Sequence, residues 1–311
     1  DPYLSRNGKY EHLKGAGTVI SMDATIDFLK RHRDGDQPMF AVTWLPSPHD
    51  PHREIPGGGA EAKQLYKDQQ TSKPGYFREI TLIDQQVGRL QVALRDLGIE
   101  KNTLFIYCSD NGGLVRESSG GREKKGSIYE GGLRVPAIFQ WPARYQARII
   151  ETPVFTSDLY PTLVAIAGAK VSPQPQLDGI DLTPILDGTS PTHPPMGFWH
   201  GYQKGESTWS DRIIKSLMEA EQSGKPNPFP GRRLKNVNEY PDLDENDLHG
   251  HAAWNSWPWK LHRIEQNGKV KIELYHLIDD PMEKNDLSSR EPERTAKMLL
   301  SLEIWQRSVL R

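Results

Sequence analysis

The sequence predicts an α/β protein with a mainly parallel sheet flanked by helices, followed by a smaller C-terminal α+β region. Apolar residues recur at steps of three and four over residues 80–97, and a short link joins this helical pattern to an apolar run at residues 104–108. Helices and strands joined by short links are typical of a mainly parallel sheet. Near the C-terminus, an Asn-Gly turn between two strand-like runs at residues 257–277 predicts an antiparallel hairpin.

The first half of the chain alternates between helical and extended patterns. Residues 22–33 have helical spacing, and the apolar residues 39–45 that follow predict a strand. The next helix carries its apolar stripe on Ile80, Ile83, Val87, Leu90, Leu94 and Leu97. Gly98 is expected to end it, because a left-handed residue after a helix is usually glycine. Residues 104–108 form the next expected strand.

The second half predicts a strand at residues 135–141 and a helix at residues 158–167, which the Ser157 hydroxyl is expected to cap. Residues 201–250 are polar and rich in proline, which indicates an insertion or long surface loop with one short helix. A final amphipathic helix is expected at residues 292–309. The sequence shows no internal repeat.

The composition excludes several classes of protein. A net charge of −2 and a pI near 6.6 give no basic surface for a nucleic acid. Mean hydropathy is −0.67, and no run of about eighteen apolar residues could span a membrane. The single cysteine, Cys108, rules out an internal disulfide and is expected to pack as a small apolar residue.

The expected strand at residues 104–108 ends in polar side chains. The segment T-L-F-I-Y-C-S-D-N-G-G places Asp110 and Asn111 directly after it, followed by two glycines that allow a sharp turn. Carboxylate and carboxamide oxygens are suitable donors for Ca²⁺ or Mg²⁺, and ligand sites gather at strand ends in α/β sheets. Asp-Asn-Gly alone is also a common turn, so the residues that follow are needed to choose between the two.

A glycine-flanked loop with two lysines, Lys124 and Lys125, follows about fifteen residues later. Paired lysines in a loop are usually only solvated. A divalent cation beside a lysine would instead suit the chemistry of a phosphate or sulfate ester.

The segment K-K-G-S-I-Y-E-G-G-L-R-V-P resembles the signature that follows the metal-binding D-N-G in the sulfatase family, of the arylsulfatase type within the alkaline-phosphatase-like superfamily. Other segments resemble family landmarks in the same order. They are M-F-A-V-T-W-L-P-S-P-H-D-P-H upstream, and T-S-D-L-Y-P-T-L-V-A-I-A-G, L-D-G-I-D-L-T-P-I-L and E-L-Y-H-L-I-D-D-P-M-E-K-N-D-L downstream. The resemblance extends from Met39 to Leu287. It implies an alkaline-phosphatase-like sheet, incomplete in this chain.

The resemblance implies a role for each candidate residue. Asp110 and Asn111 correspond to ligands of a divalent cation, Ca²⁺ with Mg²⁺ possible. His49 corresponds to the histidine of the P-H-x-P turn, a hydrogen-bond donor or general acid to the leaving oxygen, and His52 could play the same part. Lys125 corresponds to the lysine that contacts the sulfate, with Lys124 as the adjacent alternative.

Two further groups of residues have structural interpretations. Glu130 and Arg134 are expected to hold the basic loop as a buried pair. His251, Trp254, Trp257 and Trp259 could line a sugar-binding surface, but packing within the hairpin is the preferred interpretation.

The largest departure from the family is an absence. Sulfatases carry C-x-P-x-R or S-x-P-x-R, whose first residue becomes formylglycine, and neither pattern occurs here. Ser256-Trp257-Pro258-Trp259-Lys260 has the spacing but ends in lysine. The early metal-binding acids of the family are missing too. We therefore expect a fragment without the N-terminal third, inactive when expressed alone.

The sequence thus predicts a sulfuric ester hydrolase, acting in its intact form on a sulfated small molecule or carbohydrate through a metal-assisted formylglycine mechanism. The alternatives are a non-catalytic sulfatase-like protein that binds sulfated ligands and a phosphoesterase of the same superfamily. The expected divisions are a catalytic portion at residues 1–200, the insertion at 201–250 and a C-terminal subdomain at 251–311. The family suggests a periplasmic, secreted or lysosomal location, and the sequence gives no oligomeric state.

Overall fold

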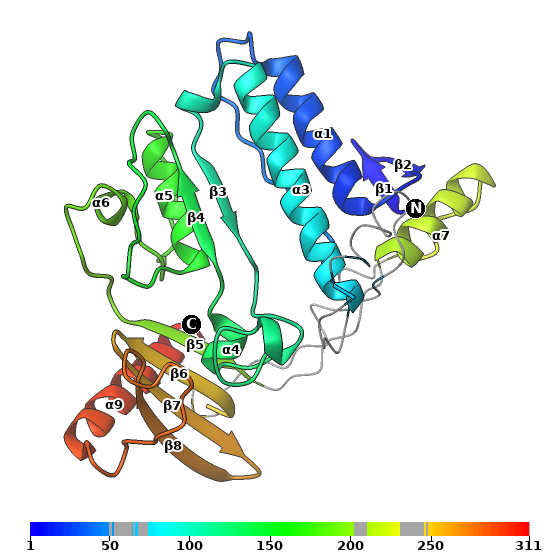
Figure 1. The fold of residues 1–311 in the computed structure, drawn as a ribbon. Helices are drawn as coiled ribbons and strands as arrows, with labels where there is room; N and C mark the ends of the chain where they lie inside the picture. The colour runs from blue at the N-terminus through cyan, green and yellow to red at the C-terminus, as the bar shows by residue number, and fades with distance from the viewer. Residues whose placement is uncertain are drawn as a thin grey trace. The chain divides into compact units, whose positions relative to one another are not determined.

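The computed structural model describes residues 1–49, 52, 64, 66–67, 74–201, 210–230, 246 and 248–310 (Figure 1). The chain divides into two compact units. The first unit comprises Asp1–Thr103 with Gly205–Pro241, and the second comprises Leu104–Lys204 with Asp242–Arg311. The domain limits expected from the sequence, with their link to a catalytic function, stay a prediction.

The first unit is mainly helical. Its elements are the antiparallel strands β1 (Tyr3–Arg6) and β2 (Lys9–His12), the helices α1 (Gly17–His32), α3 (Pro74–Asp96) and α7 (Ser210–Gln222), and the short 3₁₀ turn η1 (Glu100–Asn102). Helix α1 packs alongside α3 (Figure 1). α7 is the short helix expected within residues 201–250, and much of the rest of that expected insertion lies outside the described residues.

Helix α3 confirms the apolar stripe predicted from the sequence. Ile83, Leu90 and Leu94 are buried, and the other predicted stripe residues are half-buried. Gly98 has φ 71°, and the backbone N–H of Ile99 donates to the carbonyl of Leu94. The left-handed glycine therefore ends the helix as expected.

The strand predicted for residues 39–45 is wrong. The segment is neither helix nor strand, and no described segment forms a ladder with it. The Thr43 hydroxyl lies 2.6 Å from that of Thr25 on α1, so one face rests on that helix. Phe40, Val42 and Trp44 are 66%, 60% and 87% exposed. Strand propensity alone could not supply the hydrogen-bonding partner that a strand requires.

The second unit contains the expected strand at residues 104–108 as β3 (Phe105–Cys108), which pairs antiparallel with β4 (Ala137–Gln140). Between and after them lie η2 (Arg116–Ser118), α4 (Glu130–Leu133), η3 (Thr156–Asp158), α5 (Leu159–Ile166) and α6 (Thr183–Leu186). The cap predicted on Ser157 is wrong, because Asp158 occupies the N-cap position of α5 and Ser157 is exposed.

A four-stranded antiparallel sheet completes the second unit. Its order is β5 (Met196–His200), β6 (Gly250–Ser256), β7 (Trp259–Gln266) and β8 (Lys269–His276). Asn267 and Gly268 have φ 55° and 73°, the left-handed conformations that a tight two-residue hairpin turn requires. The predicted hairpin is therefore confirmed.

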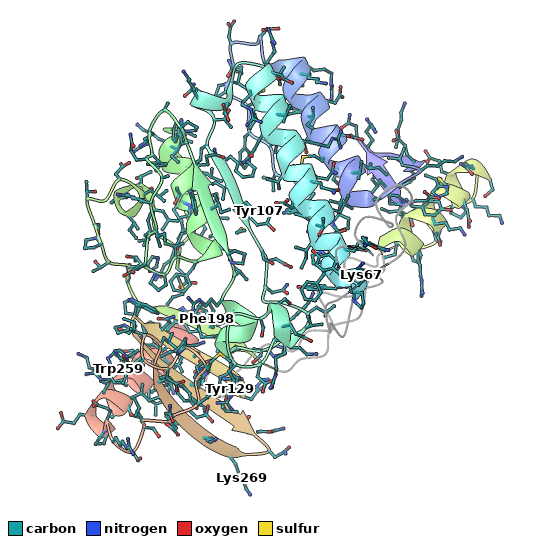
Figure 2. The ribbon with its side chains drawn as sticks, in the orientation of Figure 1. Lys67, Tyr107, Tyr129, Phe198, Trp259 and Lys269 are labelled. Carbon is teal, nitrogen blue, oxygen red and sulfur yellow. The ribbon has the colours of Figure 1, made fainter. Side chains whose placement is uncertain are left out.

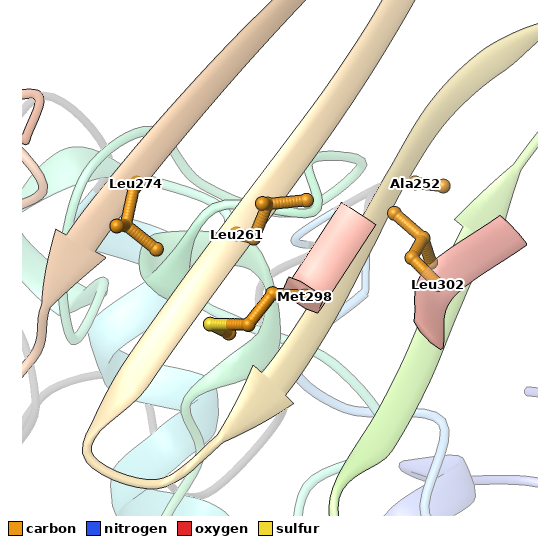
Figure 3. Packing of buried hydrophobic residues seen from close by; sticks show 5 residues of the cluster. All are labelled: Ala252, Leu261, Leu274, Met298 and Leu302. Atoms are coloured by element: carbon orange, nitrogen blue, oxygen red, sulfur yellow. The ribbon is translucent and has the colours of Figure 1, made fainter. Parts of the chain in front are cut away.

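The terminal helix α9 (Pro292–Ser308) covers one face of this sheet. Figure 3 shows the core between them, formed by Ala252, Leu261, Leu274, Met298 and Leu302. Trp254 and Trp259 pack against the same core, and His251 is buried, so the packing interpretation holds for these three. Trp257 is 43% exposed.

The fold is thus mixed α/β with a C-terminal antiparallel sheet and a terminal helix, as predicted. Every strand pair in the described part of the chain is antiparallel, so these residues do not by themselves form the parallel sheet expected for the complete fold. No described helix combines the length and the apolar character needed to cross a bilayer.

Candidate active site

The turn after β3 carries the two candidate metal ligands. Asp110 is exposed and Asn111 is half-buried, and both follow the last strand residue, Cys108, within three positions. The hydroxyl of Ser109 donates to the carbonyl of Asn111 at 2.9 Å, and the N–H of Gly112 donates to the carbonyl of Gly132 at 2.8 Å. Hydrogen bonds to backbone carbonyls therefore hold the turn, and neither candidate ligand residue is fully buried.

The donor chemistry of this turn fits a hard divalent cation in part. A carboxylate and a carboxamide oxygen suit Ca²⁺ or Mg²⁺, but Ca²⁺ takes six to eight oxygen ligands. Within the described ranges, no group of three or more His, Cys, Asp or Glu side chains could hold a metal ion. Asp110 and Asn111 could thus supply two donors of a larger set.

The basic loop, residues 122–130, lies against this turn. The N–H of Lys125 donates to the carbonyl of Gly113 at 3.0 Å, and the N–H of Ser127 donates to the carbonyl of Lys124 at 3.1 Å. Both lysine side chains are exposed. The structure therefore places the loop with Lys125 beside the turn with Asp110 and Asn111. The order of these segments in the sequence could not by itself establish that they are neighbours.

Glycines permit this close approach of backbone to backbone. A Cβ atom on Gly112 would overlap the carbonyl of Gly131, and one on Gly132 would overlap the carbonyl of Ser127. Only glycine leaves room for these contacts, which accounts for its place in the D-N-G-G and Y-E-G-G segments.

His49 belongs to the first unit, whereas Asp110, Asn111 and Lys125 belong to the second. It follows residues 39–45 in a turn closed by the N–H of His49, which donates to the carbonyl of Pro46 at 3.1 Å. Its ring is exposed. The alternative, His52, is half-buried and lies 2.8 Å from the carbonyl of Pro48 through Nε2, so its ring is held within its own turn.

The structure corrects the expected partner of Glu130. Its carboxylate accepts a 2.7 Å hydrogen bond from Nζ of Lys260, while Arg134 is exposed. Helix α4 ends at Leu133, and Arg134 already has an extended backbone, so the two side chains do not share a helix face. Glu130 does hold the loop, but through a buried lysine on β7.

Further residues, which the sequence did not indicate, surround Glu130 and Lys260. The Tyr129 hydroxyl donates to Glu273 at 2.7 Å, and the Arg122 guanidinium lies 3.8 Å from the centre of the Tyr129 ring. Figure 2 shows Tyr129 beside α4, next to the C-terminal sheet. The Glu130 N–H donates to Glu283 at 2.7 Å. These contacts join the basic loop to β7, β8 and the turn after β8. We call the residues that make them the anchor network. Its members are Arg122, Tyr129, Glu130, Lys260, His262, Glu273 and Glu283.

Burial governs the charges of the anchor network and of His251, whose ring lies beside His262. It lowers the pKa of His251 to about 4 and places the pKa of His262 well below its usual range, so both rings are neutral at pH 7. Burial also raises the pKa of the Glu283 carboxyl, against the opposing effect of Lys260. Lys260, with no exposed surface, is therefore the cation that balances Glu130 and Glu283.

The chain is similar to several known proteins. A sulfatase from Formosa agariphila is 37% identical over 198 residues, which cover 57% of this chain and 35% of that protein. The crystal structure of Ps i-CgsB matches with a TM-score of 0.73 and 24% identity over 98% of this chain and 58% of that one. BT4656, solved in complex with its substrate D-glucosamine-2-N,6-O-disulfate, matches with a TM-score of 0.62 and 17% identity over 97% and 72%. The two structural matches show a shared fold.

The chain thus spans about a third of the length of the Formosa relative and somewhat more than half of Ps i-CgsB. The family model for sulfatases matches residues 2–169, more than half of the chain. The matched range includes the D-N-G turn, the basic loop and His49. The chain belongs to the sulfatase family.

Proposed function

We propose that the protein containing these residues hydrolyses sulfate monoesters. The observation that carries the proposal is the hydrogen bond between the Lys125 N–H and the Gly113 carbonyl, at 3.0 Å, because it joins a cationic loop to an oxygen-donor turn. A cation and a lysine held side by side suit an anionic ester whose leaving oxygen gains negative charge.

Each candidate residue has a proposed role in that reaction. Asp110 and Asn111 contribute two oxygen ligands to a divalent cation, Ca²⁺ with Mg²⁺ as the alternative. When bound, such an ion neutralises negative charge and orients the groups around it. Lys125 places its ammonium group at the sulfate and the leaving oxygen, and His49 donates a hydrogen bond or a proton to the leaving oxygen. The formylglycine nucleophile of the family has no precursor motif in these 311 residues.

We propose a sulfated carbohydrate as the substrate class. The support is the named substrate of BT4656, a glucosamine disulfate, together with the shared fold. The proposed location, periplasmic, secreted or lysosomal, rests on family resemblance and is tested by fractionation with an antibody to the native protein.

Two alternatives predict different measurements. A non-catalytic relative would bind sulfated sugars without releasing sulfate. A phosphoesterase would hydrolyse 4-nitrophenyl phosphate faster than 4-nitrophenyl sulfate. The match of the sulfatase family model to residues 2–169, which includes the Y-E-G-G-L-R-V-P signature, favours the sulfate ester.

The test uses the purified full-length protein with both nitrophenyl esters, before and after chelation and after return of Ca²⁺. We expect sulfate ester hydrolysis that is lost on chelation and restored by Ca²⁺. Asp110→Ala should abolish this activity and lower the bound metal content, because it removes a charged ligand at a strand end. Asp36→Ala, at an exposed aspartate in the turn after α1, is the matched control. Near-normal activity and metal content in Asp110→Ala would refute the assignment.

A further inference from the structure

Glu283 lies on the turn after β8, has no exposed surface, and has a carboxylate that accepts from three donors. These are the backbone N–H of Glu130 at 2.7 Å, Nε2 of His262 at 2.7 Å and Nζ of Lys260 at 3.2 Å. One donor belongs to the basic-loop segment and two belong to β7. The carboxylate therefore joins the end of the loop to the C-terminal sheet.

The main chain of Glu283 holds the other end of the same loop. Its carbonyl accepts from Nη1 of Arg122 at 3.1 Å. Its φ is 50°, a left-handed conformation that is uncommon outside Gly, Asn and Asp. The tight turn lets side chain and carbonyl reach residues 122 and 130 together, and Lys124 and Lys125 lie between those two points.

Backbone hydrogen bonds of the loop connect its base to the D-N-G turn. The N–H of Gly131 donates to the carbonyl of Arg122 at 2.7 Å, closing the base of the loop. From the enclosed segment, Lys125 donates to the carbonyl of Gly113. A shift at the base of the loop would therefore move Lys125 relative to the D-N-G turn.

We propose that Glu283 is a positioning residue, which fixes both ends of the basic loop and thereby sets Lys125 against the Asp110–Gly113 turn. The catalytic consequence rests on the proposed function, whereas the hold on the loop does not. In this role Glu283 acts through the loop and does not contact substrate.

Two of the three donors, the Glu130 N–H and the Lys260 ammonium group, favour an ionised Glu283, although burial alone raises the pKa of its carboxyl. An ionised carboxylate only accepts hydrogen bonds, so Nε2 of the neutral His262 carries its proton, and Nδ1 accepts from Nε2 of His251 at 2.8 Å. This tautomer follows from the hydrogen-bond network. A glutamine at 283 would aim an amide NH₂ at one of three donors. Glu283→Gln therefore keeps the volume but breaks at least one of the three bonds.

Asp158 supplies a matched control within the same unit. It is also fully buried, and its carboxylate accepts from Phe155 N at 2.7 Å, from Ile180 N at 2.9 Å and from His193 Nε2 at 3.1 Å. Its partners lie just before η3, before α6 and, for His193, in the segment before β5. Asp158→Asn should therefore loosen the unit to a similar degree without acting on the basic loop.

The first experiment is amide hydrogen exchange on the full-length protein, which needs no enzymatic activity. We expect Glu283→Gln to speed exchange at Gly112, Lys125 and Gly131 by about tenfold. Asp158→Asn should speed exchange near residues 155–162 and 180–182 and leave the loop amides at their wild-type rates. Unchanged loop amides in Glu283→Gln, or equal loosening of the loop by Asp158→Asn, would overturn the proposal. If Glu283→Gln does not fold, Glu283→Asp, which is one methylene too short, is held to the same two outcomes.

The second experiment is a double-mutant cycle in the hydrolysis of 4-nitrophenyl sulfate. Glu283→Gln should lower kcat by about 10- to 100-fold with a smaller change in KM, because misplacement of a catalytic group by about 1 Å costs that much. In a Lys125→Ala background the same change should cost only a few-fold, since the group that it positions is gone. Independent, multiplicative effects would show that Glu283 does not act through Lys125. A wild-type protein without sulfatase activity would refute the proposed function and leave the exchange experiment to decide the loop anchor.

Discussion

Replacing Lys260 with methionine should destabilise the second unit strongly. The Lys260 side chain has no exposed surface and lies 2.7 Å from Glu130 and 3.2 Å from Glu283. Methionine has nearly the same length and fills the same space without a charge. Lys260→Met therefore leaves two carboxylates, 12% and 0% exposed, without their cation.

Removing one member of a buried ion pair costs about 3–5 kcal/mol, because the remaining charge stays desolvated. No solvent screening reduces this cost at Lys260. The backbone N–H of Glu130 still donates to Glu283, which favours the middle of that range, about 4 kcal/mol. For a unit of this size, such a loss lowers the melting temperature by roughly 8–16 °C.

The assay is thermal unfolding of the full-length protein, with Lys271→Met as the matched control. Lys271, on the neighbouring strand β8, lies 2.5 Å from Glu273, but its side chain is 68% exposed. Its loss should cost no more than about 1 kcal/mol, because solvent screens the exposed ammonium group and the buried Glu273 still accepts hydrogen bonds from Tyr129 and Tyr275. Glu130→Gln added to Lys260→Met should recover part of the loss, since it removes one of the two unpaired carboxylates. Equal effects of the two lysine substitutions, or strict additivity with Glu130→Gln, would refute the reasoning.

The loss of unfolding free energy in Lys260→Met should also depend on pH. Burial raises the pKa of Glu283 in the folded protein, and losing Lys260 removes the largest opposing influence. A carboxyl group whose folded pKa exceeds its unfolded value gains stability as the pH falls, because the folded state binds the proton more tightly. The deficit should therefore be smaller at pH 5 than at pH 8, and a larger deficit at pH 5 would contradict the assignment of charge.

Two further predictions concern single side chains. Lys125→Ala should lower the rate of sulfate ester hydrolysis by about 10²–10³, and at least tenfold more than Lys124→Ala, because only the former removes the proposed charge at the leaving oxygen; the reverse order would shift the assignment by one residue. Burial lowers the pKa of His193, but hydrogen bonds to Asp158 and to the Pro194 carbonyl outweigh it and raise the pKa above its usual value. The stabilisation by His193 should thus be complete below about pH 6.5 and be lost as pH rises through the folded pKa. Denaturant unfolding of wild type and His193→Gln between pH 5.5 and 9 would show their stability difference shrinking, and a growing difference would refute the charge on His193.

Local patterns in the sequence were enough to predict most individual elements. The stripe of α3 and its glycine end, the Asn-Gly hairpin and the terminal helix each depend on residues within a few positions of one another. The strand expected at residues 39–45 depended on a partner elsewhere, and no described segment provides one. A helix satisfies its own hydrogen bonds, whereas a strand does not, so helices were the safer prediction.

The candidate site also has one part that the sequence could predict and one part that it could not. The D-N-G turn and the lysines could be found from a short segment, since the chemistry of metal and anion binding is visible in the residue types. The anchor network could not, because it joins residues 122–130 to residues 260–283, about 150 positions away. One signal was present: Glu283 lies within the D-D-P-M-E segment that resembles a family landmark, but the resemblance alone gave it no partner.

The anchor network gives that landmark a physical reason to accompany the basic loop. An exposed loop with two lysines and five glycines in or beside it has little packing of its own, so its position must come from bonds at its ends. Arg122 and Glu130 provide those ends, and one residue, Glu283, receives both. A surface carboxylate could not serve equally well, since water would compete for its donors and salt would screen its charge. Burying Glu283 beside Lys260 and a neutral His262 removes that competition and makes the position of Lys125 depend on the C-terminal sheet.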